Sequence, residues 1–189
     1  GSSLVKINLF FLLLFISFII FKSHDDFSYY HFPYIYYLTQ TEIVFGIGNF
    51  NHGFRTPSSI FYLNSLFYLP IIKYYFFQIG AILIMGFSCY HFIYLIKERL
   101  KQNKYDKFFF LSLLFFVFTL TFFYRIAEHG TDRSAQILIF LLIIKLLLII
   151  NFDEGIRENI IKILIILGLI ISLKSFYLLY LALSFPVFY

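Results

Sequence analysis

Two short stretches of the sequence gather ionisable side chains of the types used in general acid–base chemistry. The first holds the adjacent carboxylates Asp25 and Asp26, followed closely by His31. Adjacent carboxylates repel each other unless a cation or a metal ion joins them. One carboxylate of the pair is therefore a candidate general base or metal ligand. The alternative is a hydrated pair that merely ends the apolar segment before it, and position alone leaves both interpretations open.

The second stretch, AEHGTDR, places four ionisable groups within six residues, namely Glu128, His129, Asp132 and Arg133. A short connection between two apolar segments needs only a glycine and a few polar residues, so this density favours a functional site. Carboxylate and imidazole groups together also permit a divalent cation, and oxygen-rich ligation favours Mg²⁺ or Mn²⁺ over Zn²⁺. A metal held by Asp25 and Asp132 is one hypothesis, and a site without a metal is the other.

Two further features suit a phosphate or a sugar. The turn GIGNFNHGFR contains Asn51, His52 and Arg55, and the arginine fork can bind a phosphate through two hydrogen bonds. An ordinary polar loop is the alternative, and the glycines form no nucleotide fingerprint because no strand precedes them. Lys174 lies inside an apolar run, where a charged residue usually faces a cavity or a partner. Extension of its ammonium group to the membrane surface is the alternative.

The elements that must position these groups are strongly apolar. The 189 residues are 61% hydrophobic, 24% aromatic and 13% charged, whereas soluble domains are about one quarter charged. This composition excludes both a soluble globular domain and a disordered chain. A membrane-spanning helix needs about 20 apolar residues, and the predicted spans are residues 4–21, 78–96, 108–124, 134–150 and 160–186. The last is too long for one straight span, so it is tilted or is broken near 172–175.

We therefore expect an all-α membrane protein, a polytopic bundle of about five to six transmembrane helices forming one domain over residues 1–189. The connections on one side carry eight Lys and Arg residues and those on the other side carry five, which places the N-terminus in the cytoplasm. The outer loops are then 22–77 and 125–133. In the first loop, residues 27–38 and 58–72 mix aromatic and aliphatic side chains, which predicts helices lying in the membrane interface. Pro57 and the serines after it predict the start of the second of these helices.

The order of these features resembles the N-terminal module of the GT-C membrane glycosyltransferases, which include protein O-mannosyltransferases, aminoarabinose transferases and related bacterial sugar transferases. The segment HDDFSYYHFPYIYYL is similar to the acidic opening of their first outer loop, and ISLKSFYLLYLALSFP is similar to their fifth span. The resemblance implies that Asp25 or Asp26 is the catalytic base and that Glu128 or Asp132 assists it or helps to hold a metal. It also implies that Lys174 and Arg55 meet the phosphate of the lipid carrier. The candidate substrate-binding residues are His31, Asn51, His52, Arg55, His129, Arg133 and Lys174.

The resemblance implies sugar transfer from a polyprenyl-phosphate donor to an acceptor on the outer, periplasmic side of a bacterial inner membrane. It covers only the front half or less of such an enzyme, so we expect an N-terminal fragment that is inactive alone. The partners would be the bilayer and the lipid-linked sugar, with no nucleic acid, because cytoplasmic loops account for the net charge of +5. The alternatives are a transporter or channel subunit, with His91, Lys145 and Lys174 along its path, and a non-catalytic structural membrane protein.

Overall fold

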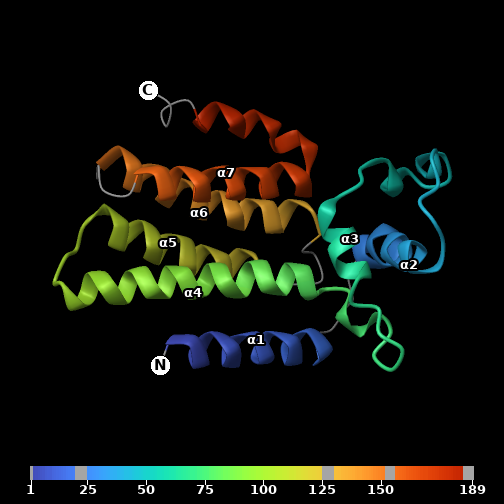
Figure 1. Cartoon of the computed structure of the whole chain (residues 1–189), viewed down its shortest axis with the longest axis horizontal. Helices are drawn as coiled ribbons and strands as arrows, with labels where there is room; N and C mark the ends of the chain where they lie inside the picture. The colour runs from blue at the N-terminus through green and yellow to red at the C-terminus, as the bar shows by residue number, and fades with distance from the viewer. Residues whose placement is uncertain (1, 20–24, 125–129, 152–155, 185–189) are drawn as a thin grey trace. The chain divides into compact units, whose positions relative to one another are not determined.

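A computed structural model describes residues 2–19, 25–124, 130–151 and 156–184 of the chain (Figure 1). Glu128 and His129 therefore lie outside the described residues. Within the described ranges the chain is helical and contains no β-strand, only an isolated bridge between Leu69 and Lys73. The prediction of an all-α protein is confirmed. The chain divides into two compact units, one formed by residues 1–86 and 125–133 and the other by residues 87–124 and 134–189.

The first unit contains the whole segment expected to form the first outer loop. Its helical elements are α1 (Ser2–Ile19), the π-helix η1 (Phe27–His31), α2 (Phe32–Gln40), the 3₁₀ helices η2 (Ile47–Asn49) and η3 (His52–Arg55), α3 (Ser59–Ser65), the 3₁₀ helix η4 (Tyr74–Phe76) and the start of α4 (Ile79–Lys101). Buried aromatic rings link α2 and α3, with the Tyr34 and Phe61 ring centroids 5.4 Å apart.

Helix α3 begins where the sequence predicts and ends earlier than expected. The Ser58 hydroxyl accepts a hydrogen bond from the Ile60 amide at 3.4 Å, which caps the first turn directly after Pro57. The helix stops at Ser65 instead of continuing to residue 72, and turns follow. Pro70 prevents the helix from reaching residue 72, because proline disfavours helical backbone in the residue before it and lacks an amide donor.

A buried polar contact fixes the start of α4. The Asn64 side-chain oxygen accepts a hydrogen bond from the Gly80 amide at 2.8 Å. The first amides of a helix have no partner within the helix, so Asn64 supplies one from α3. Further along, a Cβ atom at Gly86 would overlap the Leu13 side chain, so α1 and α4 approach closely at this glycine.

The second unit contains the rest of α4, α5 (Lys107–Phe122), most of α6 (Asp132–Asn151), α7 (Ile156–Leu173) and the 3₁₀ helix η6 (Ser175–Ser184). Phe92, Phe115 and Ile144 form a core between α4, α5 and α6, which lie side by side in Figure 1. The Phe115 and Phe140 rings stack at 4.5 Å. The helix type changes at Lys174, within the 172–175 stretch where the sequence left a tilt and a break as alternatives.

In the part of the chain that the structure describes, two helical segments are long and apolar enough to cross a membrane, judged by length and composition alone. They are Tyr74–Lys101, which includes α4, and Asp132–Ile150 in α6. Among the described residues, Ser3–Leu13 and Lys107–Phe122 are apolar helices of shorter length. The wider bundle of five to six spans is therefore a proposal, taken up below.

Candidate functional site

Tyr30, at the fourth position of the π-helix η1, lies within electrostatic range of two predicted catalytic residues. Burial and the charges of Asp26 and Asp132, in that order of size, raise the pKa of the Tyr30 hydroxyl from 10.0 to about 12. Asp26 directly precedes η1, and Asp132 is the first residue of α6. One carboxylate from each predicted outer loop thus influences the same phenol, which stays protonated at neutral pH.

A contact between His31 and Gly130 joins the same two segments. His31 is 3% exposed. A Cβ atom at Gly130 would overlap its imidazole ring, so the ring lies against the Gly130 backbone. The Tyr30 and His31 rings meet edge to face at 4.2 Å. We call Asp26, Tyr30, His31, Gly130 and Asp132 the Tyr30 cluster.

The glycine-rich turn packs against the other side of Tyr30. A Cβ atom at Gly53 would overlap the Tyr30 side chain. Asn51 holds this turn in place, because its side-chain oxygen accepts from the Gly53 amide at 2.8 Å and its side-chain nitrogen donates to the Tyr29 carbonyl at 3.3 Å. Asn51 therefore has a structural role beside the Tyr30 cluster.

Aromatic rings pack against the Tyr30 cluster. The Phe61 ring lies 5.2 Å from the His31 ring. The Tyr34 and Tyr62 hydroxyls lie 3.4 Å apart, and burial together with this hydrogen bond raises the pKa of Tyr34. The same unit contains a cavity of about 450 Å³, with an aromatic lining made by Phe32, Pro33, Tyr36, Tyr37, Gln40 and Phe54. A mainly apolar cavity near a few polar groups is typical of small-molecule sites.

The remaining predicted residues occupy different places. Asp25 is exposed, and its carbonyl accepts from the Ser28 hydroxyl at 3.1 Å. His52 is exposed in η3, and the exposed Arg55 donates from Nε to the Gly48 carbonyl at 3.1 Å, which closes the glycine turn.

Arg133 and Lys174 are both partly buried, but they belong to different units. Arg133 follows Asp132 in the first turn of α6 and is part of the first unit. Lys174 belongs to the second unit, where its amide donates to the Ile170 carbonyl at 3.3 Å. Of these two predicted substrate-binding cations, Arg133 is the one in the first unit, where it directly follows Asp132 of the Tyr30 cluster.

The metal hypothesis concerns mainly carboxylates. Within the described ranges no group of three or more His, Cys, Asp and Glu side chains is arranged to hold a metal ion. Mg²⁺ needs only one or two protein carboxylates when substrate phosphates and water complete its coordination. Asp25 and Asp132, the pair named in the metal hypothesis, are carboxylates of the type that fits this smaller requirement.

The candidate residues selected from the sequence include neither Tyr30 nor Gly53 and Gly130, the two glycines that pack against Tyr30 and His31. The spacing of Tyr30 from Asp26, four residues along a helical segment, is a signal that could have identified it, since such residues share a helix face. Gly130 and Gly53 could not be found in this way, because their roles depend on contacts between distant segments.

The chain belongs to the family described as Domain of unknown function (DUF8201), whose model matches residues 2–189. Comparison with curated proteins and with solved structures found no match.

Proposed function

We propose that this protein is the front module of a membrane glycosyltransferase that takes its sugar from a polyprenyl-phosphate donor. The observation that supports this most directly is the Tyr30 cluster, in which the charges of Asp26 and Asp132 both help to raise the pKa of one tyrosine. Carboxylates from both predicted outer loops are what the GT-C resemblance requires for catalysis. The aromatic cavity in the same unit offers apolar surface for a sugar or a lipid.

The membrane part of the proposal draws support from the surface of α5. The polar residues Ser112 and Thr119 are buried, whereas Phe110, Leu114 and Val117 are exposed. This distribution is the reverse of that on a helix surrounded by water, where apolar residues face the core. A hydrocarbon environment would accommodate it, because exposed apolar surface of this extent marks a membrane or partner contact. We infer that α5 and the two longer helices belong to a larger bundle in the bilayer, with the N-terminus in the cytoplasm.

The proposed reaction is a single displacement at the anomeric carbon of the sugar. Asp26 accepts the proton of the acceptor hydroxyl as the acceptor oxygen bonds to that carbon. The bond from carbon to phosphate oxygen breaks, and the carrier phosphate leaves with the electron pair. The Tyr30 hydroxyl remains protonated and can donate a hydrogen bond to a developing negative charge. A divalent cation, if bound by Asp25 and Asp132, would supply further charge stabilisation for the leaving phosphate.

Reconstitution in liposomes tests this proposal. The full-length natural protein is supplied with an undecaprenyl-phosphate hexose and a membrane extract as the source of acceptor, and the released carrier phosphate is measured. Loss of a general base typically lowers the rate about 10²- to 10⁴-fold. Asp26→Asn should therefore reduce the rate of carrier-phosphate release by a factor in this range, and Asp132→Asn should also reduce it. Asp25→Asn and Glu128→Gln, assayed in parallel, show which carboxylate of each pair acts.

Glu42→Gln is the matched control, because Glu42 is an exposed carboxylate of the same outer segment. It should retain wild-type turnover at equal expression. Wild-type release of carrier phosphate by all four variants of Asp25, Asp26, Glu128 and Asp132 would refute the proposed site.

A further inference from the structure

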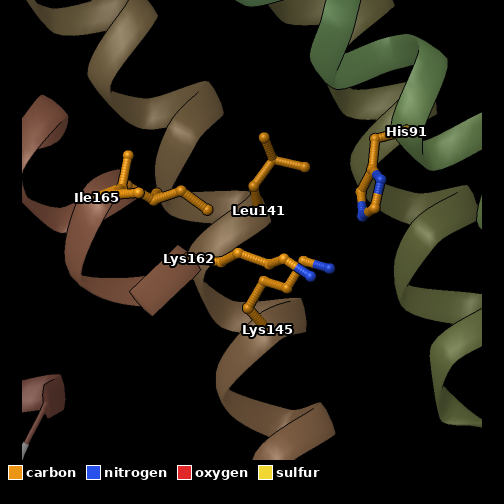
Figure 2. A pocket seen from close by; sticks show the side chains of 6 residues that line it. His91, Leu141, Lys145, Lys162 and Ile165 are labelled. Carbon is orange, nitrogen blue, oxygen red and sulfur yellow. The ribbon is translucent and has the colours of Figure 1, made fainter. Parts of the chain in front are cut away.

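The second unit contains a cavity of about 250 Å³ that the proposed sugar transfer does not use. It is lined by His91 of α4, Leu141 and Lys145 of α6, and Lys162, Ile165 and Ile166 of α7. Figure 2 shows the two lysine side chains extending in the same direction, with their nitrogen ends side by side and facing His91, whose imidazole comes from another helix. Three helices therefore place three nitrogen-bearing side chains around one space.

These nitrogen groups lack a full set of partners in the described part of the chain. Lys162 pairs with Glu158 at 3.5 Å on the exposed side of α7. Lys145 has no carboxylate partner among the described residues and lies close enough to Lys162 for their charges to repel each other. The buried Nε2 atom of His91 has no hydrogen-bond partner among the described residues. An anion would satisfy all three groups at once.

The cavity wall indicates what kind of anion would fit. Leu141, Ile165 and Ile166 supply apolar surface beside the lysines. Ile165 is exposed on the outside of α7, so the cavity lies next to the apolar surface of the helix. A ligand that combines a phosphate with a hydrocarbon chain would meet both the cations and this surface. A small hydrated anion would use only the cations.

The two lysines lie on the same side of the midpoints of α6 and α7. Lys145 lies six residues before the last residue of α6, Asn151, and Lys162 lies six residues after the first residue of α7, Ile156. Six residues of helix correspond to about 9 Å, so Lys145 lies in the C-terminal half of α6 and Lys162 in the N-terminal half of α7. From there a long lysine side chain can extend toward that end of its helix. In the orientation proposed above this end faces the cytoplasmic leaflet, where anionic lipids are concentrated.

We propose that this cavity binds the phosphate headgroup of an anionic phospholipid, with one acyl chain against Ile165. The inference depends on the proposed orientation in the membrane and does not depend on sugar transfer. Basic pockets between transmembrane helices on the cytoplasmic side are known to hold such headgroups. The bound lipid would neutralise Lys145 and stabilise the contact between α6 and α7.

Lipid retention by the purified full-length protein tests this inference. The protein in mild detergent is mixed with phosphatidylglycerol or with phosphatidylcholine of the same chain length, and bound lipid is counted by native mass spectrometry. Phosphatidylglycerol should be preferred. Each lysine near a headgroup contributes an affinity factor of about fivefold, so Lys145→Gln should weaken binding about fivefold and the double variant with Lys162→Gln by about 25-fold.

Two variants and one competitor control this experiment. Lys145→Arg keeps the charge and should keep the preference, and Lys101→Gln removes an exposed lysine outside the cavity and should change nothing. Circular dichroism establishes that every variant is folded. Equal retention of the two lipids, or unchanged phosphatidylglycerol binding in the double variant, would overturn the inference. Displacement of phosphatidylglycerol by inorganic phosphate at equal concentration would also overturn it, since the site would then recognise a free anion.

Discussion

The imidazole of His31 lies against the backbone of Gly130, with no room between them for a methyl group. His31 ends the π-helix η1, and Gly130 comes just before α6. The two residues are distant in sequence, so their contact holds the two predicted outer segments together within the first unit. Asp132 follows Gly130 by two residues, and its charge is one cause of the raised pKa of Tyr30. Packing at a glycine therefore determines whether the two carboxylates can act at one place.

Gly130→Ala tests this packing. The added methyl group would overlap the His31 ring, and overpacking of this kind costs about 1–3 kcal/mol. We expect a lower unfolding free energy in detergent and, because Asp132 would move away from Tyr30, a loss of carrier-phosphate release. Chemical unfolding followed by circular dichroism measures the first effect.

The matched control for that change is Gly168→Ala, because a Cβ atom at Gly168 has no neighbour within 4 Å. Alanine is favoured over glycine in a helix by about 1 kcal/mol, so this variant should be unchanged or slightly more stable. In a His31→Ala background, Gly130→Ala should cost less than it does alone, since the ring that it overlaps is absent. Equal costs in both backgrounds would show that the His31 contact is not the cause.

The second prediction concerns the titration of Tyr30. Removing the negative charge of Asp26 or Asp132 favours the tyrosinate, so Asp26→Asn and Asp132→Asn should each lower the pKa of Tyr30 from about 12. The pKa should stay above 10.0, because burial is the largest cause of the shift and remains in both variants. Spectrophotometric titration of each variant, compared with the same variant carrying Tyr30→Phe, isolates this residue. Glu42→Gln should leave the titration as it is in the wild type.

The raised pKa of Tyr30 also predicts a dependence of stability on pH. The folded-state pKa, about 12, lies above the unfolded value of 10.0. The favourable contribution of the protonated phenol is therefore complete below pH 10 and is lost as the pH rises toward 12. The unfolding free energy of the wild type should fall over this interval more steeply than that of Tyr30→Phe. Parallel curves for the two proteins would contradict the assignment.

The parts of the fold that depend on local chemistry could be predicted from the sequence. Apolar composition predicted helices, and Pro57 with Ser58 predicted the start of α3 because capping requires only neighbouring residues. It could also have been expected that α3 does not reach residue 72, since Pro70 acts on the residue before it. The close approach of Gly130 to His31 and of Gly53 to Tyr30 could not be predicted. Each contact joins residues that are far apart in the sequence, and local sequence patterns do not show which distant segments will meet.

The candidate site shows the same division. Asp26, His31 and Asp132 were selected from residue type and clustering, and each is linked to Tyr30. The charges of Asp26 and Asp132 raise the pKa of Tyr30, and the His31 ring lies 4.2 Å from the Tyr30 ring. Asn51 and Arg55 were selected for the same reason, yet their side chains bond to nearby carbonyls and form a turn. Residue type predicts which groups can do chemistry. It does not predict which of them the backbone uses for its own hydrogen bonds.

The third prediction concerns the polar contact at the start of α4. Asn64→Ala removes the acceptor of the buried Gly80 amide. An unsatisfied buried donor costs about 1–3 kcal/mol, so the unfolding free energy should fall by this amount and hydrogen exchange at Gly80 should become faster. Asn49→Ala, at an exposed position in η2, should change neither quantity. Unchanged exchange at Gly80 in the Asn64 variant would show that another group satisfies this amide.

The last prediction tests the membrane environment separately from catalysis. Leu114 of α5 is 56% exposed, and the proposal places it against lipid. An arginine in the middle of a spanning helix costs about 2.5–3.5 kcal/mol in insertion assays, so Leu114→Arg should reduce the fraction of protein that resists extraction by alkaline carbonate. Gln102→Arg, at an exposed position just after α4, should leave this fraction unchanged. If α5 faced water instead, Leu114→Arg would improve solubility and would leave the fold intact, because a charge on a hydrated surface costs little. A lower carbonate-resistant fraction would indicate that lipid surrounds α5, and an intact fold with improved solubility would indicate that water does.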